Sequence, residues 1–310
     1  MELRVLVDTD PGLGLKYTDV DDGLALFLML NNPEFELEGI TTVFGNSPVR
    51  KGYPLVKKYL KMAKREDIPA KLGASSKNEL GHLNGASRFL IEKVRENPNE
   101  LTLLTLGPFT NIATALLHYP SFFEDLKNIV IMGGTLTPVT VFNSVFNSID
   151  RRFFDKIPYR EIVAEFNCYK DPLATKKVIE AETKTPRIEM GLEICCRTVI
   201  TDKHVKKLEA VEKPIPQFIA RHVKFWLRMW KLITGRGGFF PFDTCVPIYL
   251  LAPEIYKSIE LFLEVDVKKL PGKFSIARAK NSAPITYCVD FQEDGGRERF
   301  LDLLISNLIR

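Results

Sequence analysis

The sequence predicts an α/β fold, an open and mainly parallel sheet with helices on both faces and additional antiparallel strands near the C-terminus. Short apolar runs rich in β-branched residues alternate with longer segments of helical periodicity. The runs end at Gly, Pro, Asn or Asp, and neither a linker nor an internal repeat interrupts the order. Because such alternation builds parallel strands through right-handed crossovers, we expect one domain over residues 1–310.

The N-terminal segment Val5–Leu30 combines an apolar strand, a loop rich in carboxylates and a Leu-rich helix from Gly23. Ligands of open α/β sheets bind at the carboxyl ends of strands, where this loop lies. Four of its carboxylates, those of Asp8, Asp10, Asp21 and Asp22, are expected to gather there. One such Asp is ordinarily an N-cap, but four within fifteen residues indicate a metal or acid/base site. Hard oxygen ligands suit Ca²⁺ or Mg²⁺.

The next segments repeat the strand–helix order. A strand over Phe35–Phe44 ends just before Asn46, which therefore lies at the same sheet edge as Asp10. The following elements are a helix over Val49–Lys64, a strand over Ile68–Leu72 and a helix over Ala86–Arg95. A strand and a helix joined at Gly-Pro follow over Leu101–His118, and then a buried strand over Asn128–Gly134. Thr135–Arg160 lacks periodicity, and we expect a long loop or small insertion there that acts as a flap.

The C-terminal half continues with helices and strands. Glu165 and Asn167 precede Asp171, which with Pro172 has the pattern of an N-cap. The pattern predicts a strand over Arg187–Leu192 and three helices, over Asp202–Leu208, Pro216–Ile233 and Thr244–Leu251. Three antiparallel strands follow, over Glu260–Val267, Lys273–Ala279 and Ile285–Asp290, and a last helix over Glu298–Leu308. Asp243 precedes the third of these helices, as an N-cap or a ligand.

Composition excludes several classes of protein. The net charge of +4, from 43 basic and 39 acidic residues, is too small to indicate a nucleic-acid partner. No apolar run reaches the roughly 18–20 residues of a membrane span, and the start lacks a signal-peptide pattern, so we expect a cytoplasmic protein. The five cysteines form no metal-binding or disulfide pattern and are expected to be mostly buried thiols.

Eight short motifs, in this order, resemble the inosine-uridine nucleoside hydrolase family. They are DTDPG at Asp8–Gly12, DD at Asp21–Asp22, GITTVFGN at Gly39–Asn46, LGPFTNIA at Leu106–Ala113, IMGG at Ile131–Gly134, AEFN at Ala164–Asn167, DP at Asp171–Pro172, and Asp243. Each motif alone is weak, but together they span most of the chain. The resemblance implies a ribonucleoside hydrolase that cleaves the N-glycosidic bond through attack of water on C1′.

The resemblance also implies roles for single residues. Ca²⁺ would be held by three carboxylates and a backbone carbonyl, those of Asp10, Asp22, Asp243 and Ile131. Asp10 would also be the general base, and the metal would orient the attacking water and lower its pKa. Ribose hydroxyls would be bound by Asp21, Asn46, Glu165 and Asn167. His82 resembles a loop His near the sugar in relatives, although a solvated loop His is the simpler explanation. We expect a homodimer or homotetramer.

The chain departs from the family pattern at three places. The eight residues Leu13–Val20 stand where the family normally has one, an insertion of seven, which leaves Asp19 as an alternative to the Asp21–Asp22 pair. The insertion costs little, because loop closure adds roughly 0.6 kcal/mol per doubling of length. Tyr159 replaces an Asn associated with recognition of the 5′-hydroxyl. Phe242 stands where many relatives have a His that protonates the leaving base. The helical pair Trp226 and Trp230 would then stack on a purine, although such a stripe usually packs in a core.

Two other functions compete with a purine-preferring ribonucleoside hydrolase. A haloacid-dehalogenase-like phosphatase also begins with Asp-x-Asp after a strand, with Asp8 as nucleophile and Asp10 as acid/base. The second Asp pair and Asn46 fit ribose better than phosphate. A ribose- or nucleoside-binding protein without catalysis is the other alternative; the retained Asp10 argues against it, and an assay separates the two.

Overall fold

The computed structural model describes residues 2–137, 164–235, 237–279 and 283–310. Its centre is an eight-stranded sheet with the strand order β3-β2-β1-β4-β5-β6-β12-β9. Every neighbouring pair is parallel except β12 and β9. The strands in this order are Ala70–Leu72, Phe35–Thr42, Leu3–Thr9, Thr102–Thr105, Asn128–Met132, Arg187–Met190, Ile285–Phe291 and Tyr256–Leu261. The predicted mainly parallel α/β fold is confirmed.

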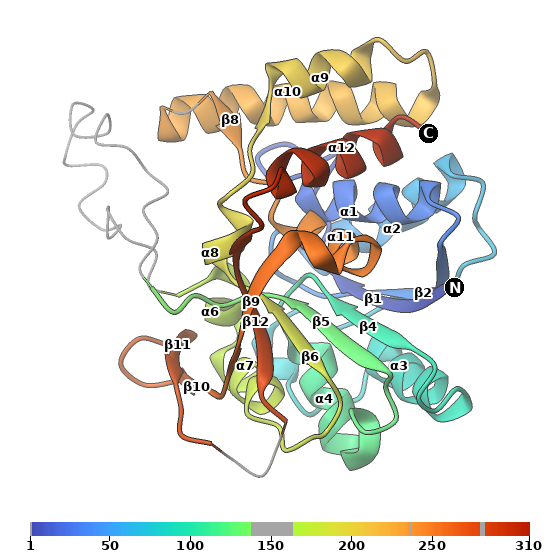
Figure 1. Cartoon of the computed structure of the whole chain (residues 1–310). Helices are drawn as coiled ribbons and strands as arrows, with labels where there is room; N and C mark the ends of the chain where they lie inside the picture. The colour runs from blue at the N-terminus through green and yellow to red at the C-terminus, as the bar shows by residue number, and fades with distance from the viewer. Residues whose placement is uncertain (1, 138–163, 236, 280–282) are drawn as a thin grey trace, which may run out of the picture.

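Helices cover both faces of this sheet (Figure 1). One face carries α1 (Asp21–Asn31), α2 (Val49–Met62), α11 (Cys245–Leu251) and α12 (Gly296–Leu308). The other carries α3 (Gly85–Glu96), α4 (Thr110–His118) and α7 (Pro172–Ile179). A separate apolar core fills each side, because each helix buries one stripe of apolar residues against the sheet. Outside the first layer lie α9 (Asp202–Glu209) and the long α10 (Pro214–Thr234).

Smaller elements connect these layers. They are the short helices α6 (Phe166–Lys170) and α8 (Leu192–Cys195) and the strand pairs β7–β8 (Ile200–Thr201, Gly238–Phe239) and β10–β11 (Leu263–Asp266, Lys273–Ile276). Short 3₁₀ turns occur at Lys77–Glu79, Pro120–Phe122, Phe242–Thr244 and Pro253–Ile255. None of the described helices has the length and apolar character that crossing a membrane requires.

Two predictions about the C-terminal strands are wrong. The segment expected as one strand, Glu260–Val267, is divided between β9 and β10, which belong to different sheets. Ile285–Asp290 was expected to be wholly antiparallel, but β12 is parallel to β6 and antiparallel only to β9. Pairing partners lie far apart in the chain, so local periodicity does not determine them. Most of the expected Thr135–Arg160 loop, with Tyr159, lies outside the described residues.

Chain order places a ligand site between β1 and β4. Successive strands run outward from β1 to β3 on one side, whereas β4, β5 and β6 continue on the other side. Ligands of open α/β sheets bind at such a reversal, beyond the carboxyl ends of the strands. Asp10 follows β1 and Leu106 follows β4 directly, so both residues lie at this position.

Candidate active site

The cavity at this sheet edge has a volume of about 390 Å³. Half of its lining is polar, with six carboxylates and two amides: Asp10, Asp19, Asp21, Asp22, Glu165, Asp243, Asn46 and Asn167. The other half is aromatic or apolar, with Tyr17, Phe166, Trp226, Trp230, Phe242, Leu106, Met132 and Leu192. A cavity whose lining combines charged groups with aromatic rings suits a ligand that has a polar part and a flat apolar part.

The Asp21–Asp22 pair does not cap α1. The cap position is Val20, and no side chain makes a capping hydrogen bond there. Asp22 instead accepts hydrogen bonds through Oδ1 from the Thr9 hydroxyl and, at 3.1 Å, from the backbone N–H of Asp10. The backbone N–H of Asp243 donates to Asp21 Oδ2 at 3.4 Å. The loop after β1, the start of α1 and the turn before α11 therefore meet at one point.

Three of these carboxylates are arranged as a metal site would require. Oxygen atoms of Asp21, Asp22 and Asp243 lie within 4.8 Å of one another, and all three residues are buried. Burial first, and then repulsion by Asp21 and Asp22, raises the pKa of Asp243 well above its usual range. Burial likewise raises the pKa of Asp21 and of Asp22. A divalent cation would offset both effects, so the donor set fits a hard metal ion.

Asp10 lies beside this cluster and is tightly enclosed. Its Oδ2 accepts a hydrogen bond from the backbone N–H of Asn46. A side chain at Gly45 would collide with Oδ2, and a Cβ at Gly107 would lie 2.9 Å from Oδ1, so both loops need glycine here. Burial, followed by the charge of Asp22, raises the pKa of Asp10 well above its usual range.

Asp8 is separated from the cavity that Asp10 lines. It is fully buried, and its Oδ1 accepts hydrogen bonds from the Thr41 hydroxyl and, at 2.9 Å, from Asn111 Nδ2. Burial raises the pKa of Asp8 to about 7, although these two hydrogen bonds oppose the rise. Asp8 is absent from the cavity wall, and a nucleophile has to reach its substrate. The position of Asp8 therefore argues against the phosphatase alternative.

Glu165 and Asn167 reach the cavity from the N-terminus of α6. Glu165 is the N-cap, and its carboxylate accepts hydrogen bonds from the backbone N–H groups of Asn167 at 2.9 Å and Cys168 at 3.1 Å. Asn167 Nδ2 donates to the carbonyl of Leu106 at 2.8 Å. Asp171 caps α7 as predicted, with Oδ1 accepting from Ala174 N–H at 3.0 Å. These bonds fix the side chains of Glu165 and Asn167 in the wall of the cavity.

Two tryptophans of α10 form much of the aromatic wall. The rings of Trp226 and Trp230 lie 5.8 Å apart and are tilted by 53°. Phe240 packs edge-on against Trp230, with ring centres 6.0 Å apart. Both indole Nε1 atoms are buried, and neither finds a hydrogen-bond acceptor in the described part of the chain. Buried N–H groups are normally paired, so a ligand with acceptor atoms would complete this wall.

Two expected site residues have different surroundings. The side chain of Ile131 is fully buried in β5, so only its backbone carbonyl could be a ligand. Its neighbour Met132 lines the cavity. His82 is exposed and is not among the residues that line the cavity. Its backbone N–H donates to the carbonyl of Glu79 at 2.9 Å in the loop before α3.

The sequence analysis did not identify Tyr17 of the inserted loop or Phe166, which lies between Glu165 and Asn167; both line the cavity. Asp19, which it considered only as an alternative to the Asp21–Asp22 pair, lines the cavity together with that pair. An aromatic and an acidic residue within an insertion beside the acidic motif were the available signal. The insertion was treated as a departure from a pattern, and its own side chains were not assigned to the site.

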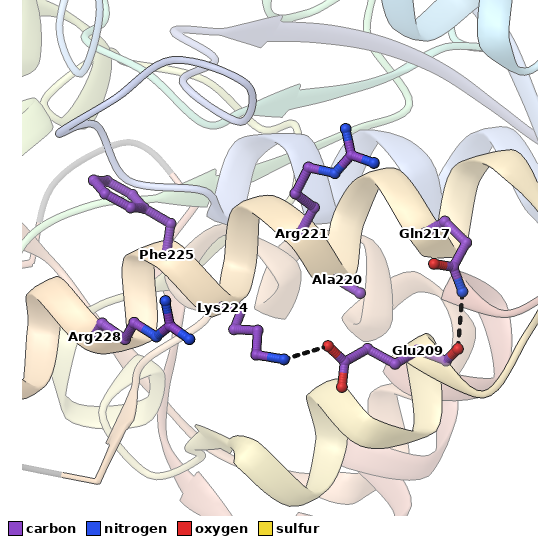
Figure 2. A pocket seen from close by; sticks show the side chains of 7 residues that line it. All are labelled: Glu209, Gln217, Ala220, Arg221, Lys224, Phe225 and Arg228. Carbon is purple, nitrogen blue, oxygen red and sulfur yellow. Dashed lines mark hydrogen bonds and ion pairs between the residues drawn. The ribbon is translucent and has the colours of Figure 1, made fainter.

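A second cavity, of about 420 Å³, lies between α9 and α10 (Figure 2). Its charged residues include Lys224 and Glu209, which form an ion pair at 2.7 Å. Gln217 donates to the carbonyl of Glu209 at 2.8 Å. This cavity lies between the outer helices α9 and α10, and three of its polar residues, Glu209, Gln217 and Lys224, bind one another. The acidic and aromatic cavity is therefore the candidate active site.

The fold and this cavity define an α/β protein whose candidate site combines a cluster of buried carboxylates with an aromatic wall. The model of the inosine-uridine preferring nucleoside hydrolase family matches residues 5–295. The chain therefore belongs to that family, and it is a ribonucleoside hydrolase that acts on the N-glycosidic bond.

Relatives with known names differ in the base they prefer. The chain is 27% identical over 350 residues to the pyrimidine-specific ribonucleoside hydrolase RihA of Salmonella enteritidis, with 99% of each chain covered. Its fold matches that of a plant nucleoside hydrolase, PpNRh1, with a TM-score of 0.83 at 22% identity, covering 100% of this chain and 99% of that one. A purine-preferring ribonucleoside hydrolase from Gardnerella vaginalis matches with a TM-score of 0.81 at 21% identity, covering 98% of each.

Proposed function

We propose that this chain hydrolyses purine ribonucleosides to ribose and free base, with Ca²⁺ bound at the acidic residues of the cavity. The observation that carries the proposal is that one cavity is lined both by a cluster of buried carboxylates and by the paired rings of Trp226 and Trp230. Ribose has several hydroxyls and suits the polar groups, whereas a purine has a large flat face and suits the aromatic rings.

Asp10, Asp22, Asp243 and the backbone carbonyl of Ile131 are the proposed Ca²⁺ ligands. Asp21 is the third member of the observed carboxylate cluster and lies beside them. The donors are oxygens, which Ca²⁺ prefers, and the raised pKa values of these buried acids show a demand for positive charge. When bound, Ca²⁺ would orient the attacking water and lower its pKa.

Asp10 is the proposed general base. Its Oδ2 accepts a hydrogen bond from the backbone N–H of Asn46, which holds the carboxylate in place, and its remaining lone pairs can take a proton from water. The surrounding carboxylates would also stabilise the positive charge that develops on ribose as the glycosidic bond breaks.

Ribose hydroxyls are proposed to bind Asp21, Asn46, Glu165 and Asn167, which all line the cavity. Glu165 and Asn167 are held by backbone hydrogen bonds, so little ordering is needed when the sugar binds. Buried groups that lose a hydroxyl partner are left unpaired, so deoxyribonucleosides should be poor substrates. His82 is left out of this proposal because its side chain is exposed and outside the cavity wall.

The aromatic wall supports a purine as the base. Phe242 lines the cavity beside Asp243 and carries no proton for the leaving base. The indole N–H groups of Trp226 and Trp230 are donors only and have no acceptor among the described residues. The N7 and O6 atoms of inosine and guanosine are both acceptors, whereas adenosine presents N7 and an amino donor. Inosine and guanosine should therefore be the preferred purines.

The test is kcat/KM for ribose release from inosine, guanosine, adenosine, uridine and cytidine, with and without a chelator. Inosine should be hydrolysed best, and chelation should abolish the activity until Ca²⁺ is restored. Trp226→Ala and Trp230→Ala should reduce inosine turnover beyond any effect on folding. Equal efficiency with uridine and inosine would reject the purine preference, and full activity in the chelator would reject the metal.

Two expectations from the sequence stay predictions. They are a homodimer or homotetramer in solution and a cytoplasmic location. Light scattering coupled to size-exclusion chromatography measures the first, and a monomer would contradict it.

A further inference from the structure

The inserted loop Leu13–Val20 is fastened to the body of the protein at its start. Leu13 is fully buried and packs so closely on α1 that a side chain at Gly23 would collide with it. The Leu13 carbonyl accepts a hydrogen bond from the buried hydroxyl of Tyr59 on α2. The Thr18 hydroxyl donates to the carbonyl of Gly12 at 2.9 Å. The insertion therefore has a defined path across the mouth of the site.

Asn46 fastens the other end of the loop. Its Oδ1 accepts a hydrogen bond from the backbone N–H of Asp19 at 2.8 Å, and its Nδ2 donates to the Asp19 carbonyl at 3.1 Å. The backbone N–H of the same Asn46 donates to Asp10. One residue thus holds the insertion in a fixed position relative to the proposed base.

Tyr17, in the middle of this loop, has an unusual backbone conformation and an exposed ring. Its φ angle is +63°, in the left-handed region that an aromatic residue rarely adopts. Its side chain is 71% exposed, although it lines the cavity. Its ring meets the edge of Phe225 on α10, with centres 5.7 Å apart and planes at 70°. Figure 2 shows Phe225 projecting from α10 on the side opposite Lys224.

The ring of Tyr17 offers apolar surface that a flat ligand in the cavity could cover. A non-glycine residue with positive φ is strained, and a ring that is 71% exposed keeps most of its apolar surface in water. Anchors on both sides of Tyr17 hold it there, so the ring is ordered before any ligand arrives. A base that covers the ring would remove apolar surface from water without a further cost of ordering.

We propose that Tyr17 is a specificity-determining residue that contacts the base of the bound nucleoside and, together with Trp226, encloses it at the aromatic wall. This inference rests on the proposed function and deepens it, because it assigns base recognition to an insertion outside the family motifs. The ring, more than the hydroxyl, makes the contact, since stacking on an aromatic face is available to every base. Purines gain most because their face is larger.

The experiment compares Tyr17→Ala, Tyr17→Phe and the matched control Lys16→Ala. Lys16 is the exposed neighbour in the same loop and does not line the cavity. KM and kcat are measured for inosine, together with the inhibition constant of free ribose. Tyr17→Ala should raise KM about tenfold, equivalent to about 1.4 kcal/mol, with kcat changed less than about twofold. The ribose constant should not move, and Tyr17→Phe should restore most of the lost affinity.

Several outcomes would overturn the inference. An unchanged KM in Tyr17→Ala would do so, and so would an equal rise in KM and in the ribose constant, which would place Tyr17 at the sugar. A loss in Tyr17→Phe as large as that in Tyr17→Ala would assign the effect to the hydroxyl. A second variant, Phe225→Leu, removes the edge contact from outside the cavity and should raise KM about threefold.

The same data separate this inference from the function on which it rests. If the wild-type protein releases no ribose from any nucleoside, both fall together. If it hydrolyses inosine and Tyr17→Ala equals the wild type, only the inference about Tyr17 falls. Melting temperatures of the Tyr17 and Lys16 variants, measured with Ca²⁺ present, should agree with that of the wild type within about 2 °C, because Tyr17 and Lys16 are exposed.

Discussion

Removal of divalent cations should lower the stability of the folded protein. Asp21, Asp22 and Asp243 are buried within 4.8 Å of one another, with Asp10 beside them. Their like charges repel in a setting with little water, and a cation that binds only the folded state compensates them. The perturbation is a chelator, compared with 1 mM Ca²⁺ or 1 mM Mg²⁺ in otherwise identical buffer.

The size of the effect follows from binding linkage and chain length. If Ca²⁺ binds with a Kd of about 1 µM, then 1 mM Ca²⁺ stabilises the folded state by about 4.1 kcal/mol. The unfolding entropy of a chain of 310 residues is about 0.65 kcal/mol/K near the melting temperature. The melting temperature should therefore rise by about 6 °C when Ca²⁺ is added to the chelated protein.

The pH dependence of this shift has a definite sign. Burial, and then the neighbouring acids, raises the pKa of Asp21 and Asp243 in the folded state without a cation. The contribution of these two acids to the free energy of unfolding is fully present below their pKa in the unfolded chain, about 3.9. It is lost as pH rises through their raised pKa in the folded protein. The chelated protein therefore weakens from about pH 4 upward, and the Ca²⁺ shift should be larger at pH 7.5 than at pH 5.5.

Differential scanning calorimetry at both pH values measures this shift. Asp243→Asn should lose most of it, whereas the charge-matched control Asp294→Asn, at an exposed position, should keep it. A Ca²⁺ shift under about 1 °C at pH 7.5 would refute the argument, and so would an undiminished shift in Asp243→Asn.

Three further predictions concern single side chains. Asp10→Asn should lower kcat by about 10³-fold while the protein stays folded, since a general base is worth 10²–10⁴-fold; near-normal turnover at saturating inosine would contradict its role. Trp230→Phe keeps an aromatic ring but removes the N–H, so the ratio of kcat/KM for inosine to that for adenosine should fall about tenfold; an unchanged ratio would show that this N–H does not read the base. Burial opposes ionisation of Glu38, but hydrogen bonds from Arg4 at 2.9 Å and Lys93 at 3.2 Å outweigh it and lower its pKa. The contribution of Glu38 to the free energy of unfolding is present above the pKa of Glu38 in the unfolded chain, and it is lost as pH falls through the lowered pKa of the folded protein. Glu38→Gln should therefore reduce the free energy of unfolding in urea by about 1–2 kcal/mol at pH 7 and by little below about pH 4.

The sequence alone determined the features that depend on neighbouring residues. Apolar runs and their periodicity identified the central strands and most helices, because each element buries a regular stripe. The Asp-Pro pattern correctly placed Asp171 as the cap of α7. The rule that ligands bind beyond the carboxyl ends of parallel strands predicts from the sequence that Asp10 and Asn46 lie together, and both line the cavity.

Only the tertiary structure decided how residues far apart in the chain meet. Asp8 and Asp10 are two positions apart, yet Asn111, about a hundred residues later, binds Asp8 behind the sheet edge while Asp10 faces the cavity. The placement of β12 between β6 and β9 and the attachment of Asp19 to Asn46 are of the same kind. Such contacts join segments that come together only when the whole chain packs, so the local sequence pattern does not predict them.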